Sequence, residues 1–342
     1  MTFGESHGAA VGVVIDGVPA KVELSLEDIQ KELDRRRPGQ SAVTTQRKEP
    51  DTAEILSGVF EGRTTGTPLA VIIRNTDQKS KDYKKILNVF RPGHADFTFL
   101  KKFGIRDHRG GGRSSGRETA ARVMAGAVAK KILAQHGITT AAYTKAVGDI
   151  VAQTIDLKVI EQNPVRTADA SVADAMAKRI QEAGQRGDSV GGIVEAVVRG
   201  CPAGLGDPVF DKLDARLSHA VMSIGAVKGV EFGTGFRVST MTGLENNDAF
   251  ENAGGDVHTK TNNAGGILGG ISNGEDIILR LAVKPTSSIS KEQQTVNIEG
   301  KAADIQVSGR HDPCLCPRIV PVVEAMINIT LLDCVLIQKS IT

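Results

Sequence analysis

The feature that most constrains the fold is a long helical pattern of small apolar residues at 117–135. Its apolar positions are Ala120, Ala121, Val123, Ala125, Ala127, Val128 and Ile132, and Gly137 ends the pattern just beyond them. Side chains this small indicate close packing against neighbouring elements. The chain also offers few large rings for a core, since it has no Trp and only two Tyr among 342 residues.

Glycine is unusually frequent, with 38 of the 342 residues, compared with about 7% in an average protein. Many backbone positions must therefore adopt positive φ or approach another group closely. At about 150 residues per domain the length allows two domains. However, strands and helices alternate without a βαβ rhythm, and no biased linker divides the chain. We expect a single interwoven α+β domain over 1–342.

The charge balance excludes some classes of protein. There are 42 basic and 40 acidic side chains, a net charge of +2, which argues against nucleic-acid binding driven by bulk charge. Hydrophobic residues make up 40% of the chain, which excludes disorder. The four cysteines lack zinc-site spacing, so we expect reduced thiols and no metal site. The most apolar segment, 319–337, is interrupted by polar residues, so we expect a cytoplasmic protein without a membrane span.

Periodicity and turn signals predict the elements along the chain. We expect strands at 9–18, 55–60, 68–73, 192–199, 232–241, 276–283 and 295–307, with a strand and helix pair near 140–185. We expect helices starting in a capping box at Ser25 and Asp28, and at 117–135, 209–224 and 318–337. The stretch 75–114 shows no regular pattern, and an irregular stretch this long is more often functional than idle.

Four arginines, three consecutive glycines and two serines gather at 106–117, directly before the long helix. The N–H groups of a helix N-terminus, its positive dipole end and guanidinium groups together favour an anion site. A solvated surface loop would have the same composition, so this segment does not decide alone. Its spacing matches neither of the common nucleotide-binding glycine patterns, which disfavours those families.

Four shorter motifs place chemically useful side chains in turns or at strand ends. They are Gly4-Glu5-Ser6-His7-Gly8, Arg91-Pro92-Gly93-His94-Ala95-Asp96, Lys284-Pro285-Thr286-Ser287-Ser288 and Gly309-Arg310-His311-Asp312-Pro313-Cys314. Each has an ordinary structural explanation, such as an exposed histidine, a plain turn or a helix cap. Ser6 and His7 alone do not predict a nucleophile and its base, because sequence neighbours in an extended chain point apart.

In combination, the motifs resemble those of the chorismate synthase family over nearly the whole chain. Two further segments carry the resemblance, Arg35-Arg36-Arg37-Pro38-Gly39 and Arg113-Ser114-Ser115-Gly116-Arg117-Glu118-Thr119. Six motifs in the same order rarely coincide by chance. The resemblance implies an α+β fold, a β-α-β sandwich with central antiparallel sheets and helices outside, assembled as a homotetramer.

The resemblance further implies an enzyme, a carbon–oxygen lyase acting on phosphate. It would convert 5-enolpyruvylshikimate 3-phosphate to chorismate by anti-1,4-elimination of phosphate and a ring proton. Reduced FMN would be bound but not consumed, with NADPH as one candidate reductant. Because the substrate carries a phosphate and two carboxylates, its pocket needs several cations. The matching positions supply Arg36, Arg91, Arg117 and Arg310.

The family roles carry over residue by residue. His7 would protonate the departing phosphate, His94 would lie beside the flavin, and Asp312 would relay the proton from flavin N5. Ser6 and Ser115 would orient these groups and the substrate. The FMN site would consist of Arg113, Ser114, Ser115, Gly225, Ala226, Gly269, Lys284, Pro285, Thr286, Ser287, Ser288 and Arg310.

Three features depart from the usual family pattern. The chain begins at Met1, later than the family usually does. Ala42 replaces a second loop arginine and would weaken anion or pyridine-nucleotide contact. Gly225 replaces an asparagine that commonly contacts the flavin, which would leave a flavin polar group without its usual partner. The segment 40–51 has no apolar anchors, and we expect it to order only when substrate and FMN bind.

Two alternatives stay open at this point. One is an impaired relative that only binds flavin or anions, which a measurement of phosphate release under reducing conditions would separate from an active enzyme. The other is an RNA-binding protein that uses the arginine-rich loops. The near-neutral net charge and the scarcity of aromatic residues for base stacking disfavour it.

Overall fold

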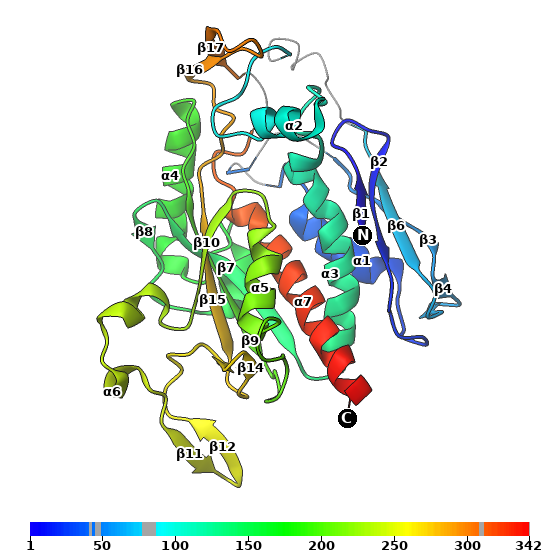
Figure 1. The fold of residues 1–342 in the computed structure, drawn as a ribbon, viewed down its shortest axis with the longest axis vertical. Helices are drawn as coiled ribbons and strands as arrows, with labels where there is room; N and C mark the ends of the chain where they lie inside the picture. Colours follow the sequence, from blue (N-terminus) through cyan, green and yellow to red (C-terminus); the bar gives the residue numbers. More distant parts are fainter. Residues whose placement is uncertain (41–42, 45–48, 77–86, 308–310, 342) are drawn as a thin grey trace.

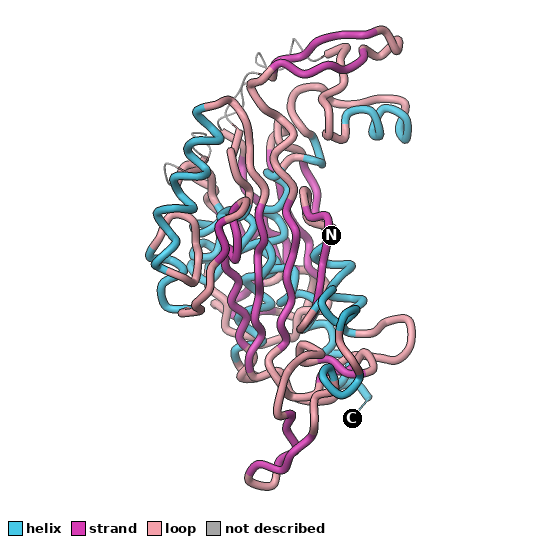
Figure 2. The backbone as a smooth tube through the Cα atoms, turned by 90° about the vertical axis from the view of Figure 1, so that its left-hand side faces the viewer, coloured by secondary structure: helices cyan, strands magenta, loops and turns pink. Residues whose placement is uncertain are grey.

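The computed structural model describes residues 1–40, 43–44, 49–76, 87–307 and 311–341. Its main strands form two antiparallel sheets, with the orders β1-β2-β6-β3 and β10-β15-β9-β7-β8. The first sheet contains β1 (Thr2–Gly4), β2 (Ala10–Ile15), β6 (Leu69–Arg74) and β3 (Ala53–Ser57). The second contains β10 (Val227–Phe232), β15 (Ile277–Val283), β9 (Gly192–Arg199), β7 (Thr139–Val147) and β8 (Ile150–Val151). Figure 2 shows long strands running side by side along the molecule.

A layer of helices lies between the two sheets (Figure 1). It comprises α1 (Leu26–Arg36), α3 (Thr119–Ala134), α5 (Leu213–Met222) and α7 (Cys316–Ile341). Helix α3 packs against β2 of one sheet, and α7 packs against β7 and β9 of the other. The α+β class and the β-α-β sandwich of antiparallel sheets are therefore confirmed, but the expectation of central sheets with helices outside is wrong, because helices fill the centre. Most residues of α3 and α7 are apolar and buried, as expected for helices inside a protein.

The close packing predicted from the small residues of α3 is confirmed. A Cβ atom placed on Gly126 would lie 2.2 Å from the Cβ atom of Ala325 in α7. No side chain fits between the two helices at this point, so their backbones approach closely. One hydrophobic cluster connects this contact with both sheets, from Val11 in β2 to Val335 in α7.

Helix α1 begins as its sequence predicts. The Ser25 hydroxyl accepts from the Asp28 amide, and the Asp28 carboxylate accepts from the Ser25 amide, which is a complete capping box. Ile29 and Leu33 are fully buried, but Leu26 lies on the outer side and is 38% exposed. The last residue of the helix, Arg36, is 1% exposed and points into the protein.

Three predicted segments differ in the structure. The strand expected at 232–241 is wrong, because β10 ends at Phe232 and positive φ at Gly233 and Gly235 turns the chain into a 3₁₀ helix. The strand expected at 295–307 is a hairpin of β16 (Glu292–Val296) and β17 (Ala302–Gln306). The irregular stretch contains helix α2 (Asp96–Phe103), which ends at Gly104 in the left-handed region.

The remaining elements are short or peripheral. They are β4 (Val59–Phe60), β5 (Arg63–Thr64), α4 (Ala173–Gln185), α6 (Gly243–Asn246), β11 (Phe250–Ala253), β12 (Asp256–Thr259), β13 (Ile267–Leu268) and β14 (Ile271–Ser272). The β11–β12 hairpin extends from one end of the molecule, and the β16–β17 hairpin lies at the other (Figure 1).

Helix α7 is long and apolar enough to cross a membrane, by length and composition alone. The sequence argument against such a segment relied on its polar residues, one of which is Glu324. In the structure Glu324 is 4% exposed and forms an ion pair with Arg35, 2.6 Å away. Because 78% of the most apolar window of α7 is buried inside the protein, we interpret α7 as a core helix.

Candidate active site

A cavity of about 570 Å³ lies where α3 and α7 begin, at the upper end of the helical layer in Figure 1. Its walls come from segments far apart in the sequence. They are the end of α1, the turn before α2, the 111–119 turns and the first turn of α3, the 223–226 turn, the end of β15, and the 311–322 segment. Helix N-termini carry partial positive charge, so their meeting here favours an anionic ligand.

The charged side chains of the cavity are predominantly basic. Among the described residues, six arginines and one lysine line it, against the two carboxylates of Glu118 and Asp312. Apolar side chains complete the wall, namely Phe99, Ile224, Leu315, Ile319 and Val322. A cavity of this kind suits a ligand that combines several negative charges with a flat apolar body.

Most of the predicted site residues come together here. The cavity is lined by Arg36, Arg91, His94, Arg113, Ser114, Ser115, Arg117, Gly225, Ala226, Lys284, Pro285, Thr286, Ser287, Ser288 and Asp312. Ser6, His7 and Gly269 are not among the lining residues. Arg310 and Ala42 lie outside the described residues, as do residues 41–42 and 45–48, half of the 40–51 segment for which ligand-induced ordering was predicted. The expectation that this segment has no apolar anchor is wrong, because Val43 is 1% exposed and belongs to the hydrophobic core.

Ser6 and His7 lie against Gly110, the neighbour of Gly111 in the cavity wall. A Cβ atom on Gly110 would lie 2.5 Å from Nδ1 of His7, so only glycine permits this approach. Ser6 Oγ and His7 Nδ1 are 3.0 Å apart and share a hydrogen bond. The expectation that these neighbours point apart was wrong, because residues 6 and 7 form a turn rather than extended chain.

Gly269 does not lie with the other predicted residues that line the cavity. It occupies the turn between β13 and β14 with a φ of +60°. The adjacent Gly270 accepts a hydrogen bond from the Leu213 amide at the start of α5. Gly269 therefore does not line this cavity, because the β13–β14 hairpin places it near the start of α5, and its assignment to the FMN site stays a prediction.

A buried carboxylate holds two of the predicted substrate arginines. Asp51, which is 0% exposed, accepts from Nη1 of Arg36 at 3.2 Å and from Nη1 of Arg117. Nε of Arg36 donates to Thr119, and Nε of Arg117 donates to Asn75. These contacts fix both guanidinium groups before any ligand arrives.

The pKa of Arg36 reflects this crowded environment. Burial and the nearby cations of Arg318 and Arg117 lower the pKa of Arg36 to about 9, while Asp51 opposes the shift. At that value the side chain still carries its charge at neutral pH. It therefore contributes positive potential to the cavity even though its own donors are occupied.

Arg91, His94 and Asp96 form a second preorganised group at the start of α2. Arg91 donates from Nε and Nη2 to both oxygens of Asp96, each at 2.8 Å, and also to the Gly110 carbonyl. Nδ1 of His94 lies 3.1 Å from Asp96. Although burial opposes it, the hydrogen bonds from Arg91 and His94 hold the pKa of Asp96 well below its usual value. An ionised Asp96 favours a hydrogen bond from a protonated Nδ1 of His94.

The end of β15 brings Lys284 and Thr286 to the same cavity. Lys284 Nζ donates to the Gly93 carbonyl at 2.9 Å, and burial together with Lys228 lowers the pKa of Lys284. Thr286 Oγ1 donates to the backbone carbonyl of Asp312 at 2.7 Å. The Asp312 carboxylate accepts from Nη1 of Arg318. Strand β15 and helix α7 thus fix the position of Asp312 jointly.

Comparison with known proteins gives one consistent answer. The sequence model of the family described as chorismate synthase matches residues 1–336. A chorismate synthase of Methanocella arvoryzae is 56% identical over 337 residues, covering 97% of this chain and 91% of the relative. One of Maridesulfovibrio salexigens is 54% identical over 338 residues, covering 99% and 95%. A crystal structure of chorismate synthase matches with a TM-score of 0.79 and 32% identity, covering 99% of this chain and 91% of that one.

The chain belongs to the chorismate synthase family. Chorismate synthases are lyases that act on a small molecule, 5-enolpyruvylshikimate 3-phosphate, and release chorismate and phosphate. This is the last common step of the shikimate pathway to the aromatic amino acids. The predicted family and its reaction are confirmed, and the basic cavity is consistent with a substrate that carries three anionic groups.

Sequence reasoning missed three side chains of this chorismate synthase cavity. Arg122, His311 and Arg318 all line it. Burial and the Arg91 cation lower the pKa of His311, and its Nε2 is buried without a partner among the described residues. Arg122 and Arg318 lie in the first turns of α3 and α7. Their only sequence signal was a cation in the first turn of a helix that follows a polar loop.

The cavity residues fit the FMN that the family is known to use. A Cβ atom on Gly225 would meet nothing within 4 Å, so the wall leaves space there. A cavity of about 570 Å³ that is lined by apolar, hydroxyl and cationic side chains suits a flavin and its phosphate. Among the lining residues, Lys284, Ser287 and Ser288 supply a cation and two hydroxyl groups.

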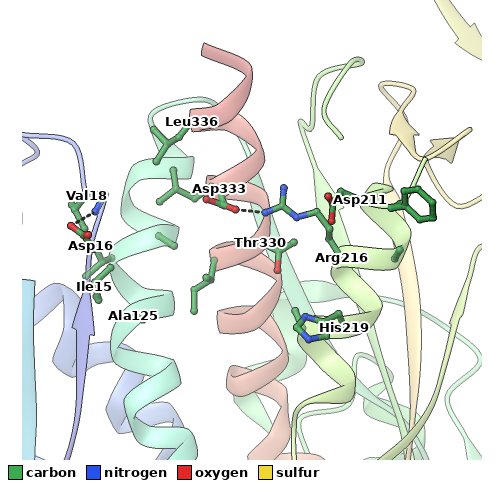
Figure 3. Close-up of a pocket in the computed structure, with 18 residues that line it drawn as sticks. Ile15, Asp16, Val18, Ala125, Asp211, Arg216, His219, Thr330, Asp333 and Leu336 are labelled. Carbon is green, nitrogen blue, oxygen red and sulfur yellow. Dashed lines mark hydrogen bonds and ion pairs between the residues drawn. The ribbon is translucent and has the colours of Figure 1, made fainter. Parts of the chain in front are cut away.

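A second cavity, of about 450 Å³, lies between α3, α5 and α7 (Figure 3). It is mainly apolar and contains none of the six sequence motifs. Its main polar feature is an ion pair between Arg216 of α5 and Asp333 of α7. Among the described residues, no group of three or more His, Cys, Asp or Glu side chains could hold a metal ion, and the four cysteines are free and buried.

Proposed function

We propose that the basic cavity at the start of α3 and α7 is the catalytic centre, and that it binds the substrate and reduced FMN together. The observation that supports this is the excess of cations, seven against two carboxylates among the described residues, in one cavity with an apolar wall. A phosphate and two carboxylates on the substrate, and a phosphate on FMN, would balance this charge.

The arginines serve mainly to preorganise the site. Arg36 and Arg91 are held by Asp51 and Asp96, so their positive charge is fixed and costs no reorganisation when an anion binds. Nη2 of Arg117 is buried and has no partner among the described residues, which leaves a donor for the ligand. The substrate is then positioned by charge that exists before it binds.

Three side chains would handle protons. Asp312, oriented by Arg318 and Thr286, accepts the proton that leaves the substrate ring. His94 exchanges a proton at Nε2, because its Nδ1 is bound to Asp96. His7, held by Ser6 behind Gly110, donates toward the departing phosphate. Reduced FMN, when bound, supplies electron density that helps the phosphate leave and a nitrogen atom through which the proton passes.

The test is phosphate release from 5-enolpyruvylshikimate 3-phosphate with FMN and a chemical reductant. We expect turnover that requires both, and a loss of about 10²- to 10⁴-fold in the rate for His7→Ala, the usual range for a lost general acid. Asp312→Asn should also slow turnover while FMN affinity changes little, because the amide keeps the shape of the side chain. No phosphate release by the wild type would contradict the proposal. Near-normal turnover of either variant would contradict the role given to that residue.

We also propose that the chain forms a homotetramer in the cytoplasm, without a membrane or nucleic-acid partner. Large apolar side chains are strongly exposed in the single chain, including Phe210 at 94%, Leu244 at 93% and Phe236 at 80%. Exposed apolar residues of this size are typical of surfaces covered by another subunit. NADPH is a candidate reductant, and oxidation of NADPH by the purified chain with FMN would test that role.

A further inference from the structure

Arg318 is a cavity residue that belongs to none of the six sequence motifs. It lies in the first turn of α7, and its side chain is 15% exposed. Its Nη1 donates to Asp312, while its Nε is buried without a hydrogen-bond partner among the described residues. A buried N–H group without a partner is uncommon in native proteins and calls for an explanation.

The other cavity arginines have more of their donors occupied. In each, at least two of the three guanidinium nitrogens donate to partners in the protein; these residues are Arg36, Arg91, Arg113, Arg117 and Arg122. In Arg318, only Nη1 has a partner among the described residues. Arg318 therefore keeps more unused hydrogen-bonding capacity than any other arginine that lines this part of the cavity.

The charged side chains around Arg318 also favour binding of an anion. Arg117 and Arg318 both lie close enough to Arg36 for their positive charges to act on it. Two carboxylates oppose these three cations, since Asp51 pairs with Arg36 and Arg117, and Asp312 pairs with Arg318. One positive charge remains unbalanced in a mostly buried cluster, where an anionic ligand group would be strongly favoured.

We propose that Arg318 binds an anionic group of the substrate directly and shares its guanidinium between that group and Asp312. This inference rests on the proposed function of the cavity. The planar guanidinium suits a carboxylate or a phosphate, because it can donate two parallel hydrogen bonds to either. When the substrate takes part of this guanidinium, Asp312 loses part of its cationic partner and becomes a better proton acceptor. Substrate binding and proton transfer are thereby coupled through one side chain.

The experiment measures substrate affinity by calorimetry in the presence of oxidised FMN, so that no turnover occurs. We expect Arg318→Met to weaken substrate binding at least tenfold while FMN affinity changes less than twofold. Arg318→Lys should recover part of the affinity, because it keeps the charge but not the planar group. Arg216→Met is the matched control, since Arg216 is also a partly buried helical arginine paired with an aspartate. It lies in the second cavity, shown in Figure 3, away from the basic cavity. Its substrate affinity should equal that of the wild type.

A purely structural role for Arg318 gives a different pattern. If Arg318 acts only by holding Asp312, Arg318→Met should have no further effect on substrate affinity when combined with Asp312→Asn. We expect the tenfold loss to persist in that double variant. The proposal would be overturned if the tenfold loss of substrate affinity disappeared in the double variant. It would also be overturned if Arg318→Met lost FMN affinity equally, or if its substrate affinity were unchanged.

Two further comparisons complete the test. Inorganic phosphate serves as a second probe: Arg318→Met should weaken its binding if Arg318 holds the substrate phosphate, and leave it unchanged if Arg318 holds a carboxylate. A wild-type chain that does not bind the substrate would overturn the proposed function together with this inference. If the wild type and Arg318→Met both bound the substrate normally, only the inference about Arg318 would be overturned.

Discussion

At the scale of single residues, a substitution at Gly225 tests the FMN site by an expected gain in FMN affinity. The resemblance to the family indicates an asparagine at this position, and the structure leaves open space beside the Gly225 backbone. We expect Gly225→Asn to strengthen FMN binding by about threefold to tenfold, since one hydrogen bond contributes about 0.5–1.5 kcal/mol. Fluorescence titration measures the change, with Gly243→Asn, on the exposed helix α6, as the control. Unchanged FMN affinity in Gly225→Asn would show that the flavin does not lie against this turn.

Asp96 should make stability depend on pH. Its folded-state pKa lies below its ordinary value of 3.8, because the hydrogen bonds from Arg91 and His94 outweigh the effect of burial. A carboxylate with a depressed pKa stabilises the fold above its unfolded-state pKa, and this contribution is lost as the pH falls toward the folded-state value. We expect Asp96→Asn to be less stable than the wild type at neutral pH, with a difference that shrinks below about pH 4. Urea denaturation at several pH values measures this, and a difference independent of pH would contradict it.

At the scale of elements, the contact between α3 and α7 sets the layer order of the fold. Gly126→Ala would place a methyl group 2.2 Å from the Cβ atom of Ala325. The two helices would have to separate, and such overpacking costs about 1–3 kcal/mol of unfolding free energy. Gly243→Ala is the matched control, because an added Cβ meets nothing within 4 Å there. Chemical denaturation should show a loss for Gly126→Ala only, and equal stability of the two variants would mean that the helices can adjust.

At the scale of the whole molecule, the exposed apolar residues of the 236–257 arm predict assembly. Leu244 is 93% exposed and Phe250 is 63% exposed, at the end of the molecule that carries the β11–β12 hairpin (Figure 1). We expect the wild type to sediment as a tetramer and the variant with Leu244→Glu and Phe250→Glu as a smaller species, because burying two carboxylates in an interface is costly. Phe60→Glu, on β4, serves as a control that should remain tetrameric. Sedimentation of the wild type as a monomer would contradict the proposed homotetramer.

The sequence by itself determined the family, the reaction and most of the cavity residues. It did so because the motifs around His94, Arg113 and Lys284 are local: their residue types and order are visible without knowing what lies beside them. Local rules also predicted the capping box of α1, because it depends on residues within one turn. The small residues of α3 predicted close packing but not its partner, which is α7.

Only the tertiary structure decided how these segments meet. The central position of the helices follows from the contacts of α3 with β2 and of α7 with β7, which join residues far apart in the chain. Likewise, no motif contains Asp51 or Arg318, because their importance comes from the guanidinium groups and the carboxylate that folding brings beside them. Charge pairing in a buried cavity depends on distance in space, and sequence spacing does not encode that distance.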